Sequence, residues 1–85
     1  MNKLICSVYD KKAESHSIPV FQDNKGVALR NFMDAVNDPN SAINKHPEDF
    51  SFHVLGEFDP LSGLIISYEE FQPIASALDV IKKEI

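Results

Sequence analysis

The sequence predicts an α+β fold, in which a small antiparallel sheet of about three to four strands carries two helices packed on one face. Three observations favour this class. Polar and apolar residues alternate with a period of two over residues 50–58, apolar residues recur with a helical period over residues 29–36, and a turn containing proline and glycine follows at residues 59–63. The chain of 85 residues has the size of one domain, so residues 1–85 are expected to form a single globular domain.

The first predicted strand covers residues 3–9, where apolar residues follow one another with little interruption. The next segment, residues 10–17, is polar almost throughout and is typical of a solvated loop. Residues 18–21 then predict an extended edge strand, because Pro19 has no backbone N–H group to donate within a sheet.

A helix is predicted between Asn24 and Pro39. Apolar side chains fall at positions i, i+3, i+4 and i+7 from Leu29 to Val36, while polar side chains occupy the opposite side. Asn24 is the predicted N-cap, and the residue before Pro39 is disfavoured in the α conformation, which ends the helix. The polar connection at residues 40–49 leaves room for about one short helical turn.

Residues 50–58 form the next predicted strand, and Gly56 is expected to weaken this strand or to form a β-bulge. The loop at residues 59–63 should return the chain into a strand at residues 64–67, which pairs antiparallel with the preceding strand. Periodicity assigns some aromatic residues to the core and leaves the others for surface roles. The core set is Phe32, Phe50, Phe52 and Phe58, and the remaining set is Tyr9, Phe21, Tyr68 and Phe71.

The C-terminal segment predicts the second helix. Pro73 suits the first position of a helix, and apolar residues from Ile74 to Ile85 form one stripe along it. Lys82 and Lys83 lie near the end of this helix, where positive charge stabilises the negative end of the helix dipole.

The face of the sheet opposite the helices carries several apolar side chains. Full exposure of such a face to water is unfavourable, so we expect this face, or an edge strand, to form a homo-oligomeric contact. The residues predicted to line the face are Ile5, Ser7, Tyr9, His53, Leu55 and Glu57.

Composition excludes several classes of protein. The net charge of −5 has the wrong sign for a protein that holds nucleic acid by a uniformly basic surface. Cys6 is the only cysteine, which excludes an internal disulfide and a cysteine-based zinc cluster and fits a reducing cytosol. The longest wholly apolar run has three residues, so neither a membrane-spanning segment nor a signal peptide is expected.

The sequence predicts no catalytic residue, no metal site and no cofactor. Cys6 falls on the core side of its strand, where a thiol is inert, and the histidines lack the spacing of a metal-binding pair. The only dense cluster of acid–base groups is H-P-E-D at residues 46–49, for which a turn started by Pro47 is the favoured explanation. A hydrolase built on this cluster would need His16 or His53 to converge with it.

A local basic patch is a candidate for binding nucleic acid, because single-strand binders combine basic side chains with aromatic stacking platforms. Gly26 lies in the first turn of the predicted helix, where backbone N–H groups can hold a phosphate. An ordinary helix start with solvated basic side chains is the alternative explanation of this segment. The candidate nucleic-acid-binding residues are Lys11, Lys12, Lys25 and Arg30 for phosphate and Tyr9 for stacking.

Four short motifs occur in order along the chain: S-V-Y-D-x-K-A at residues 7–13, G-V-A-x-R-x-F at residues 26–32, H-P-E-D-F at residues 46–50 and L-G-x-F-D at residues 55–59. They resemble the small nonstructural protein of gokushoviruses, which are tailless single-stranded DNA phages within the microviruses. The last two motifs are the most specific, and the sequence after Gly63 matches only loosely. The motif members of unassigned role are Gly26, His46, Pro47, Glu48 and Asp49.

The resemblance implies a phage protein that is made in the host bacterial cytoplasm and is absent from the mature virion. Such proteins are commonly described as DNA-binding and assigned to viral DNA replication, and the family provides no catalytic residues to transfer. We therefore expect a non-enzymatic accessory protein of single-stranded genome synthesis that acts by binding DNA. The alternative is a protein-interaction module that recruits a phage or host replication or assembly protein without contacting DNA.

Overall fold

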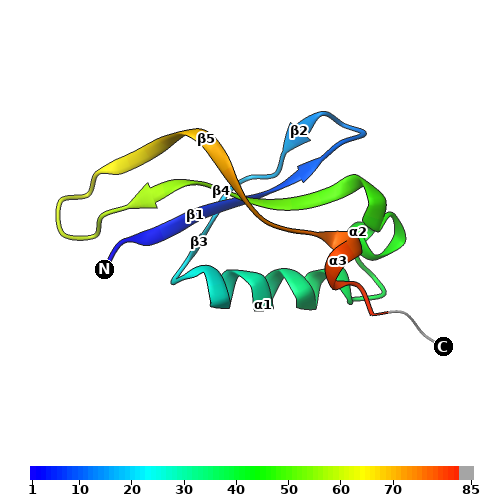
Figure 1. The fold of residues 1–85 in the computed structure, drawn as a ribbon. Helices are drawn as coiled ribbons and strands as arrows, with labels where there is room; N and C mark the ends of the chain where they lie inside the picture. Colours follow the sequence, from blue (N-terminus) through cyan, green and yellow to red (C-terminus); the bar gives the residue numbers. More distant parts are fainter. Residues whose placement is uncertain (83–85) are drawn as a thin grey trace.

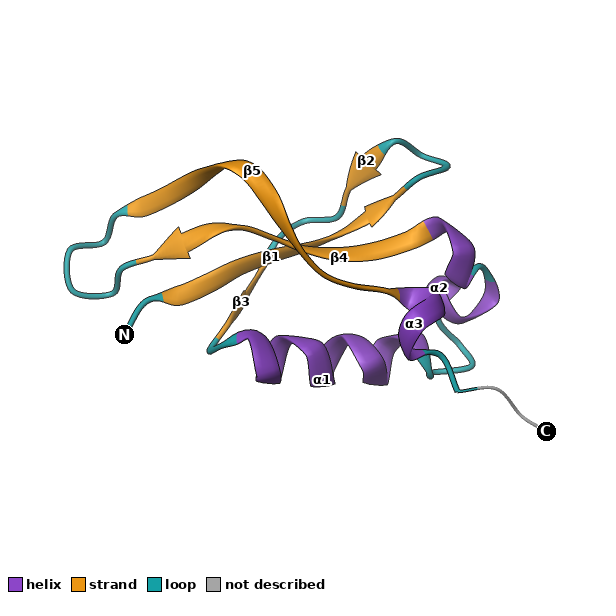
Figure 2. Cartoon of the chain, in the orientation of Figure 1, coloured by secondary structure: helices purple, strands orange, loops and turns teal. Residues whose placement is uncertain are grey.

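Five strands form one antiparallel sheet in the computed structural model, which describes residues 1–82, and helix α1 runs along one side of this sheet (Figures 1 and 2). The order of strands across the sheet is β2-β1-β4-β5, and β3 also pairs with β1. The α+β class is therefore confirmed, with more strands than expected. The elements are β1 (Lys3–Asp10), β2 (Ser15–His16), β3 (Val20–Gln22), α1 (Lys25–Val36), α2 (Ala42–Lys45), the 3-10 turn η1 (Pro47–Asp49), β4 (Phe50–Phe58), β5 (Ile65–Ser76) and α3 (Ala77–Val80).

β1 lies at the centre of the sheet. One edge of β1 pairs with β4 along its whole length, and the other edge is shared by the two short strands β2 and β3. The predicted strand at residues 3–9 is thereby confirmed, and the one at residues 18–21 is confirmed in part, because β3 begins only at Val20. The prediction of a loop throughout residues 10–17 is wrong at its end, because Ser15–His16 form β2. Ser15 and His16 pair with the backbone at the end of β1, and a polar sequence pattern does not reveal such a pairing.

The core lies between α1 and the sheet. Side chains from α1 meet those of the two central strands, and the rings of Phe32 and Phe52 stack with their centroids 4.9 Å apart. The buried residues of α1 are spaced by four, so Ala28 rather than Leu29 begins its core face. The buried core residues are Cys6, Ala28, Phe32, Val36, Phe52, Val54 and Ala77.

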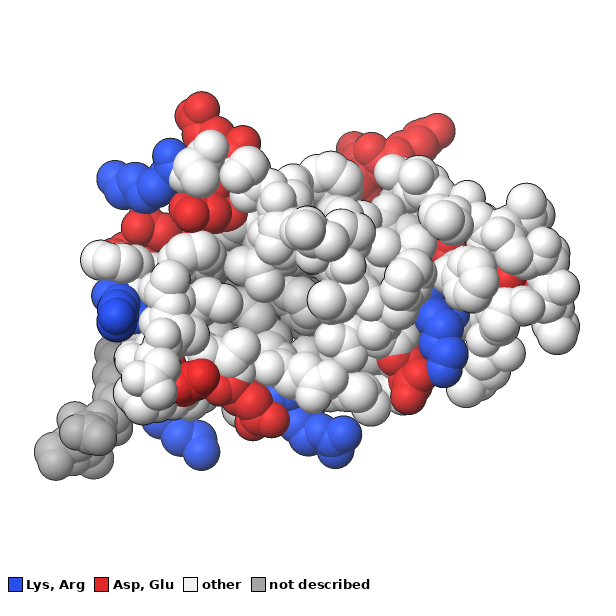
Figure 3. Space-filling model, turned by 180° about the vertical axis from the view of Figure 1, so that it is seen from behind, with Lys and Arg blue, Asp and Glu red and all other residues white. Residues whose placement is uncertain are grey.

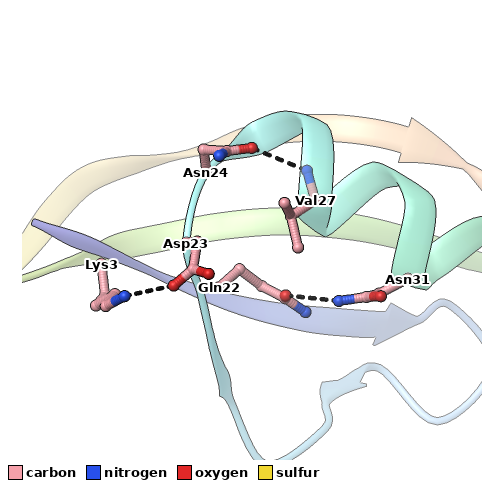
Figure 4. Close-up of polar contacts among 6 residues, drawn as sticks. All are labelled: Lys3, Gln22, Asp23, Asn24, Val27 and Asn31. Atoms are coloured by element: carbon pink, nitrogen blue, oxygen red, sulfur yellow. Dashed lines mark hydrogen bonds and ion pairs between the residues drawn. The ribbon is translucent and has the colours of Figure 1, made fainter.

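Polar side chains hold the start of α1 against β3 (Figure 4). Asn24 is the N-cap, as predicted, and its side-chain oxygen accepts a hydrogen bond from the Val27 N–H at 2.9 Å. One turn later, Asn31 donates from its side-chain nitrogen to the Gln22 side-chain oxygen at 2.9 Å. The cap satisfies an otherwise unpaired backbone donor, and the second bond fixes the angle between strand and helix.

A β-bulge at Leu55 and Gly56 interrupts the pairing of β4 with β1, which confirms the irregularity expected at Gly56. The extra residue reverses the alternation of side chains along β4. Phe58 consequently lies on the face opposite Phe52, where its ring meets the ring of Phe21 with centroids 5.8 Å apart. The assignment of Phe58 to the core is therefore wrong.

The prediction of a helix from Pro73 onward is wrong for most of its length. β5 continues through Pro73 to Ser76 beside β4, and only Ala77–Val80 are helical. Pairing with β4 satisfies the backbone over this stretch, and an edge strand tolerates a proline, so strand pairing prevails over a local helical spacing. The second of the two predicted helices is thus reduced to one turn, and residues 83–85 lie outside the described residues.

The long connection after α1 contains two short turns of helix. The helical turn expected there is confirmed as α2, and Ser41 caps it by accepting a hydrogen bond from the Asn44 N–H at 3.1 Å. Over residues 1–82, no helix is long and apolar enough to cross a membrane.

Candidate functional site

Two segments that carry the family resemblance, residues 7–13 and residues 46–50, meet in the structure although they are far apart in the sequence. The Lys11 N–H donates a hydrogen bond to the Asp49 carbonyl oxygen at 2.8 Å. A groove of about 520 Å³ lies beside this contact, and we name it the H-P-E-D groove. It is lined by Asp10, Lys12, Ala42, His46, Glu48, Asp49 and Phe50.

Local backbone chemistry shapes the H-P-E-D groove on both sides. Pro47 begins the 3-10 turn, as predicted, and this turn contains both carboxylates of the motif. On the other side, the Asp10 carboxylate accepts hydrogen bonds from the Lys12 and Ala13 N–H groups at 2.9 and 3.2 Å. These bonds close the turn after β1 and hold Lys12 at the rim of the groove.

His46, Glu48 and Asp49 are the acid–base side chains at one wall of the groove. Their ligand atoms all lie within 4.8 Å of one another, a spacing that a metal ion could bridge. The His46 Nδ1 lies 3.9 Å from the Glu48 Oε1, and both side chains are exposed. The lining residues include no hydroxyl or thiol nucleophile, and His16 and His53 pack against each other outside this groove. The groove can therefore bind a cation or a polar group, but it lacks the parts of a nucleophilic hydrolase.

The predicted nucleic-acid-binding residues are divided between the two ends of β1. Lys11 and Lys12 follow the last residue of β1, whereas Lys25 begins α1 near the first residue, where Lys3 forms an ion pair with the β3–α1 corner (Figures 1 and 4). A strand of eight residues spans roughly 23 Å between its first and last residue. Arg30 is exposed further along α1. The structure does not bring these basic residues together into one patch.

Tyr9, the predicted stacking residue, lies half-buried in an aromatic cluster on the sheet face opposite α1. Its ring centroid lies 4.8 Å from that of His16 and 6.0 Å from that of His53. The ring of Phe71 packs on both histidines, with centroids 4.8 Å from His16 and 6.2 Å from His53. We name these four residues the His16/His53 cluster. The ring of Tyr9 is thus engaged by contacts within the chain.

The sheet face opposite α1 is largely covered by the chain itself. Ile5 and Ser7 are buried, and the Ser7 Oγ donates a hydrogen bond to the Ser17 carbonyl oxygen at 2.7 Å. The segment after β2 and the side chain of Phe71 from β5 provide this cover. Tyr9, His53 and Leu55 are half-buried, whereas the prediction for Glu57 is wrong, because the bulge places it beside Leu4 on the α1 face. Phe21 and Phe71 remain more than half exposed on the face opposite α1.

A continuous run of exposed apolar residues follows the start of β5 and the loop that precedes it. β5 is the last strand of the sheet. The exposed apolar side chains are Leu64 in the loop and Ile65 and Ile66 in β5, of which Ile65 is 65% exposed. We name residues 64–67 the β5 edge. The sequence pattern predicted a strand here but not that this strand is exposed, apolar and flanked by acidic residues. The absence of Lys, Arg and His from residues 57–81 is the signal that could have indicated it. The same stretch contains five carboxylates, Glu57, Asp59, Glu69, Glu70 and Asp79.

Comparison with known proteins places the chain in a family. A family model described as Phage ORF5 protein matches residues 3–80, and no solved structure matches the chain. The chain is 37% identical over 67 residues to Protein ORF5 of Chlamydia phage 1, a match that covers 74% of this chain and 70% of that protein. The resemblance to the small nonstructural protein of gokushoviruses is confirmed by these matches. Since the family match spans both segments that meet at the H-P-E-D groove, as well as all of β5, the chain belongs to the Phage ORF5 protein family.

Proposed function

We propose that this member of the Phage ORF5 family is a non-enzymatic accessory protein that binds a phage or host replication or assembly protein. The observation that carries this proposal is the β5 edge, where an outer strand combines backbone groups that pair with no other strand within residues 1–82 with exposed apolar side chains. Such an edge is a template for pairing with another chain, and monomeric proteins normally keep apolar edge strands short or covered.

The distribution of charge also favours a protein partner over nucleic acid. The chain carries a net charge of −5, which opposes a polyanion. Figure 3 shows that Lys and Arg side chains are scattered in separate groups on one face of the molecule, with a broad uncharged area between them. Binding through phosphate neutralisation needs a converging basic surface, whereas binding through apolar contact does not.

Binding of single-stranded DNA is the second candidate function, and one local observation favours it. Lys11 and Lys12 are exposed on the turn after β1, beside the H-P-E-D groove. The carboxylates of Asp10, Glu48 and Asp49 in the same groove would repel a phosphate that approached these lysines. For this reason we rank DNA binding below protein binding.

A DNA titration separates the two functions. Labelled single-stranded and double-stranded oligonucleotides would be titrated with the chain at low and moderate salt, with fluorescence anisotropy as the readout. We expect no saturable binding at moderate salt. Saturable binding that is lost in a Lys11→Ala/Lys12→Ala variant, and kept in a matched Lys25→Ala/Arg30→Ala variant, would contradict the proposal and favour DNA.

A pairwise interaction assay tests the protein partner directly. The chain would be assayed by two-hybrid pairing against each other protein encoded by the same phage, and the hits would be repeated with purified proteins. We expect at least one pair that an Ile65→Lys variant loses and an Arg30→Ala variant keeps, because Ile65 is exposed on the β5 edge and Arg30 is exposed on α1. Pairs that survive Ile65→Lys would overturn the role of the β5 edge.

A further inference from the structure

We infer that the β5 edge binds an extended basic segment of its partner, which joins the sheet as an additional strand beside residues 64–67. This inference rests on the proposed function and specifies the chemistry of the partner. It is supported by the backbone geometry of the edge, by the side chains beside it and by the charges at its two ends.

Every second residue of the β5 edge directs its backbone N–H and C=O groups away from the sheet. The Asp59 N–H donates to the Leu64 carbonyl oxygen at 2.9 Å, and Ile66 lies opposite Glu57 in the ladder. In an antiparallel pair, every second residue bonds to the partner strand, so the intervening residues Ile65 and Ser67 direct their N–H and C=O groups outward. No described strand pairs with this side of β5. An added strand would form hydrogen bonds with both the N–H and the C=O group of Ile65 and of Ser67.

The side chains of the β5 edge would add apolar contacts to this backbone pairing. Leu64 and Ile65 are more than half exposed, and Ile66 is exposed as well. Since Ile65 and Ile66 point to opposite faces of the strand, an added strand would gain an apolar neighbour on each of its own faces.

The length of the usable edge is limited by an irregularity in β5. Ser67 lies opposite Gly56 and Gln72 lies opposite Val54, so residues 68–71 bulge out of the ladder. This bulge carries Glu69 and Glu70, both exposed, directly after the regular edge. The added strand is therefore expected to pair with the four residues of the β5 edge and to end at the two carboxylates.

Carboxylates lie at both ends of the β5 edge, and they favour a partner segment with positive charge. Asp59 lies opposite Leu64 at one end, and Glu69 and Glu70 follow the other end. Residues 57–81 contain no Lys, Arg or His. The Asp59 carboxylate accepts hydrogen bonds from Leu61 and Ser62 and lies near the positive N-terminus, so the exposed Glu69 and Glu70 are the carboxylates that favour a basic partner most. A second copy of this chain would bring equal charges together, whereas a segment with Lys or Arg near its ends would pair with them.

Short peptides test the inference with the full chain in solution. The probes are an eight-residue peptide of alternating Lys and Val, the matched peptide of alternating Glu and Val, and the Lys peptide methylated on alternate backbone nitrogens. Amide chemical shifts and hydrogen exchange of the isotopically labelled chain report where each peptide binds. We expect the Lys peptide alone to shift and protect the amides of Ile65 and Ser67, with an affinity that falls as salt is raised.

Two matched variants test the charge contribution. Glu69→Gln/Glu70→Gln should weaken binding of the Lys peptide roughly two- to tenfold, as expected for two exposed ion pairs. Glu14→Gln/Asp34→Asn removes the same charge at exposed positions outside β5 and should leave the affinity unchanged.

Several results would overturn the inference. These are equal binding of the Lys and Glu peptides, shifts confined to the H-P-E-D groove, no binding of the Lys peptide, and a dimer in sedimentation that Ile65→Lys dissociates. The last result would assign the edge to a second copy. If a protein pair is lost in Ile65→Lys but the Lys peptide does not bind, the proposed function stands and only the basic character of the partner is wrong.

Discussion

His16 and His53 illustrate how much a single residue depends on its surroundings. Their ring centroids lie 5.8 Å apart, and within the described residues the His16 Nε2 and the His53 Nδ1 are buried without a hydrogen-bond partner. Burial, and then the positive charge of a protonated His16, lower the pKa of His53 below its ordinary value of 6.5. Protonation of His53 therefore opposes the folded state.

Stability should fall as the pH is lowered, because of the depressed pKa of His53. Because the folded pKa of His53 is depressed, the unfolded chain takes up its proton first, so the free energy of unfolding decreases from about pH 6.5 toward the folded pKa. Urea unfolding at several pH values between about 5 and 7 would measure this loss. A His53→Gln variant should flatten the profile in this window, where the lowered pKa values of Asp23 and Asp59 keep both carboxylates ionised. An unchanged slope in His53→Gln would contradict the assignment.

The bulge in β4 is the element that sets the geometry of the hairpin. It moves Phe58 to the face of Phe21 and lets β5 approach β4 closely at Gly56. A Cβ atom added to Gly56 would overlap the Ile66 carbonyl oxygen, which is backbone and cannot rotate away. Glycine at this position therefore permits the close approach of two strands.

Gly56→Ala should destabilise the fold more than Gly63→Ala, the same substitution at the other glycine of the hairpin. The overlap with the β5 backbone must separate the two strands, and we expect the free energy of unfolding to decrease by about 2–4 kcal/mol. Gly63→Ala is the matched control, since its Cβ would meet open space and only its φ of +77° is unfavourable, at a cost of about 1 kcal/mol. Urea unfolding of both variants gives the comparison, and equal losses would show that the close approach is unimportant.

At the scale of the whole molecule, one core joins elements from both ends of the chain. Cys6 of β1, Phe32 of α1, Phe52 of β4 and Ala77 of α3 all belong to it. Burial raises the pKa of the Cys6 thiol to about 11, so the reactive thiolate is scarce at neutral pH. The thiol is thus an internal probe of whether the core stays closed.

Cys6 should react with a disulfide reagent only when the core opens. We expect the labelling rate to be very low in native buffer and to rise with urea in parallel with the loss of circular dichroism, because both report unfolding of the same core. The fully unfolded chain in concentrated guanidinium chloride provides the reference rate. Rapid labelling without denaturant would show that β1 opens independently of the rest.

Local patterns in the sequence predicted much of the fold and little of the candidate surfaces. The alternation in β4 and the cap at Asn24 depend on near neighbours, and both are observed. The H-P-E-D cluster was visible as a motif, but its contact with Lys11 joins residues that are remote in sequence. The separation of Lys11 from Lys25 has the same origin, since their positions depend on the length and direction of β1.

The sequence by itself determined the α+β class, the first helix, the turns and the acidic, apolar character of β5, because these follow from the period and composition of contiguous residues. Tertiary structure alone decided that Pro73 lies in a strand, that Phe58 leaves the core and that Phe71 covers His16 and His53. Each of these outcomes depends on which strand pairs with which, and on a bulge that shifts the register. Hydrogen bonds to a partner strand outweigh the weak local preference of a segment, so the pairing decides both its conformation and which side chains remain at the surface.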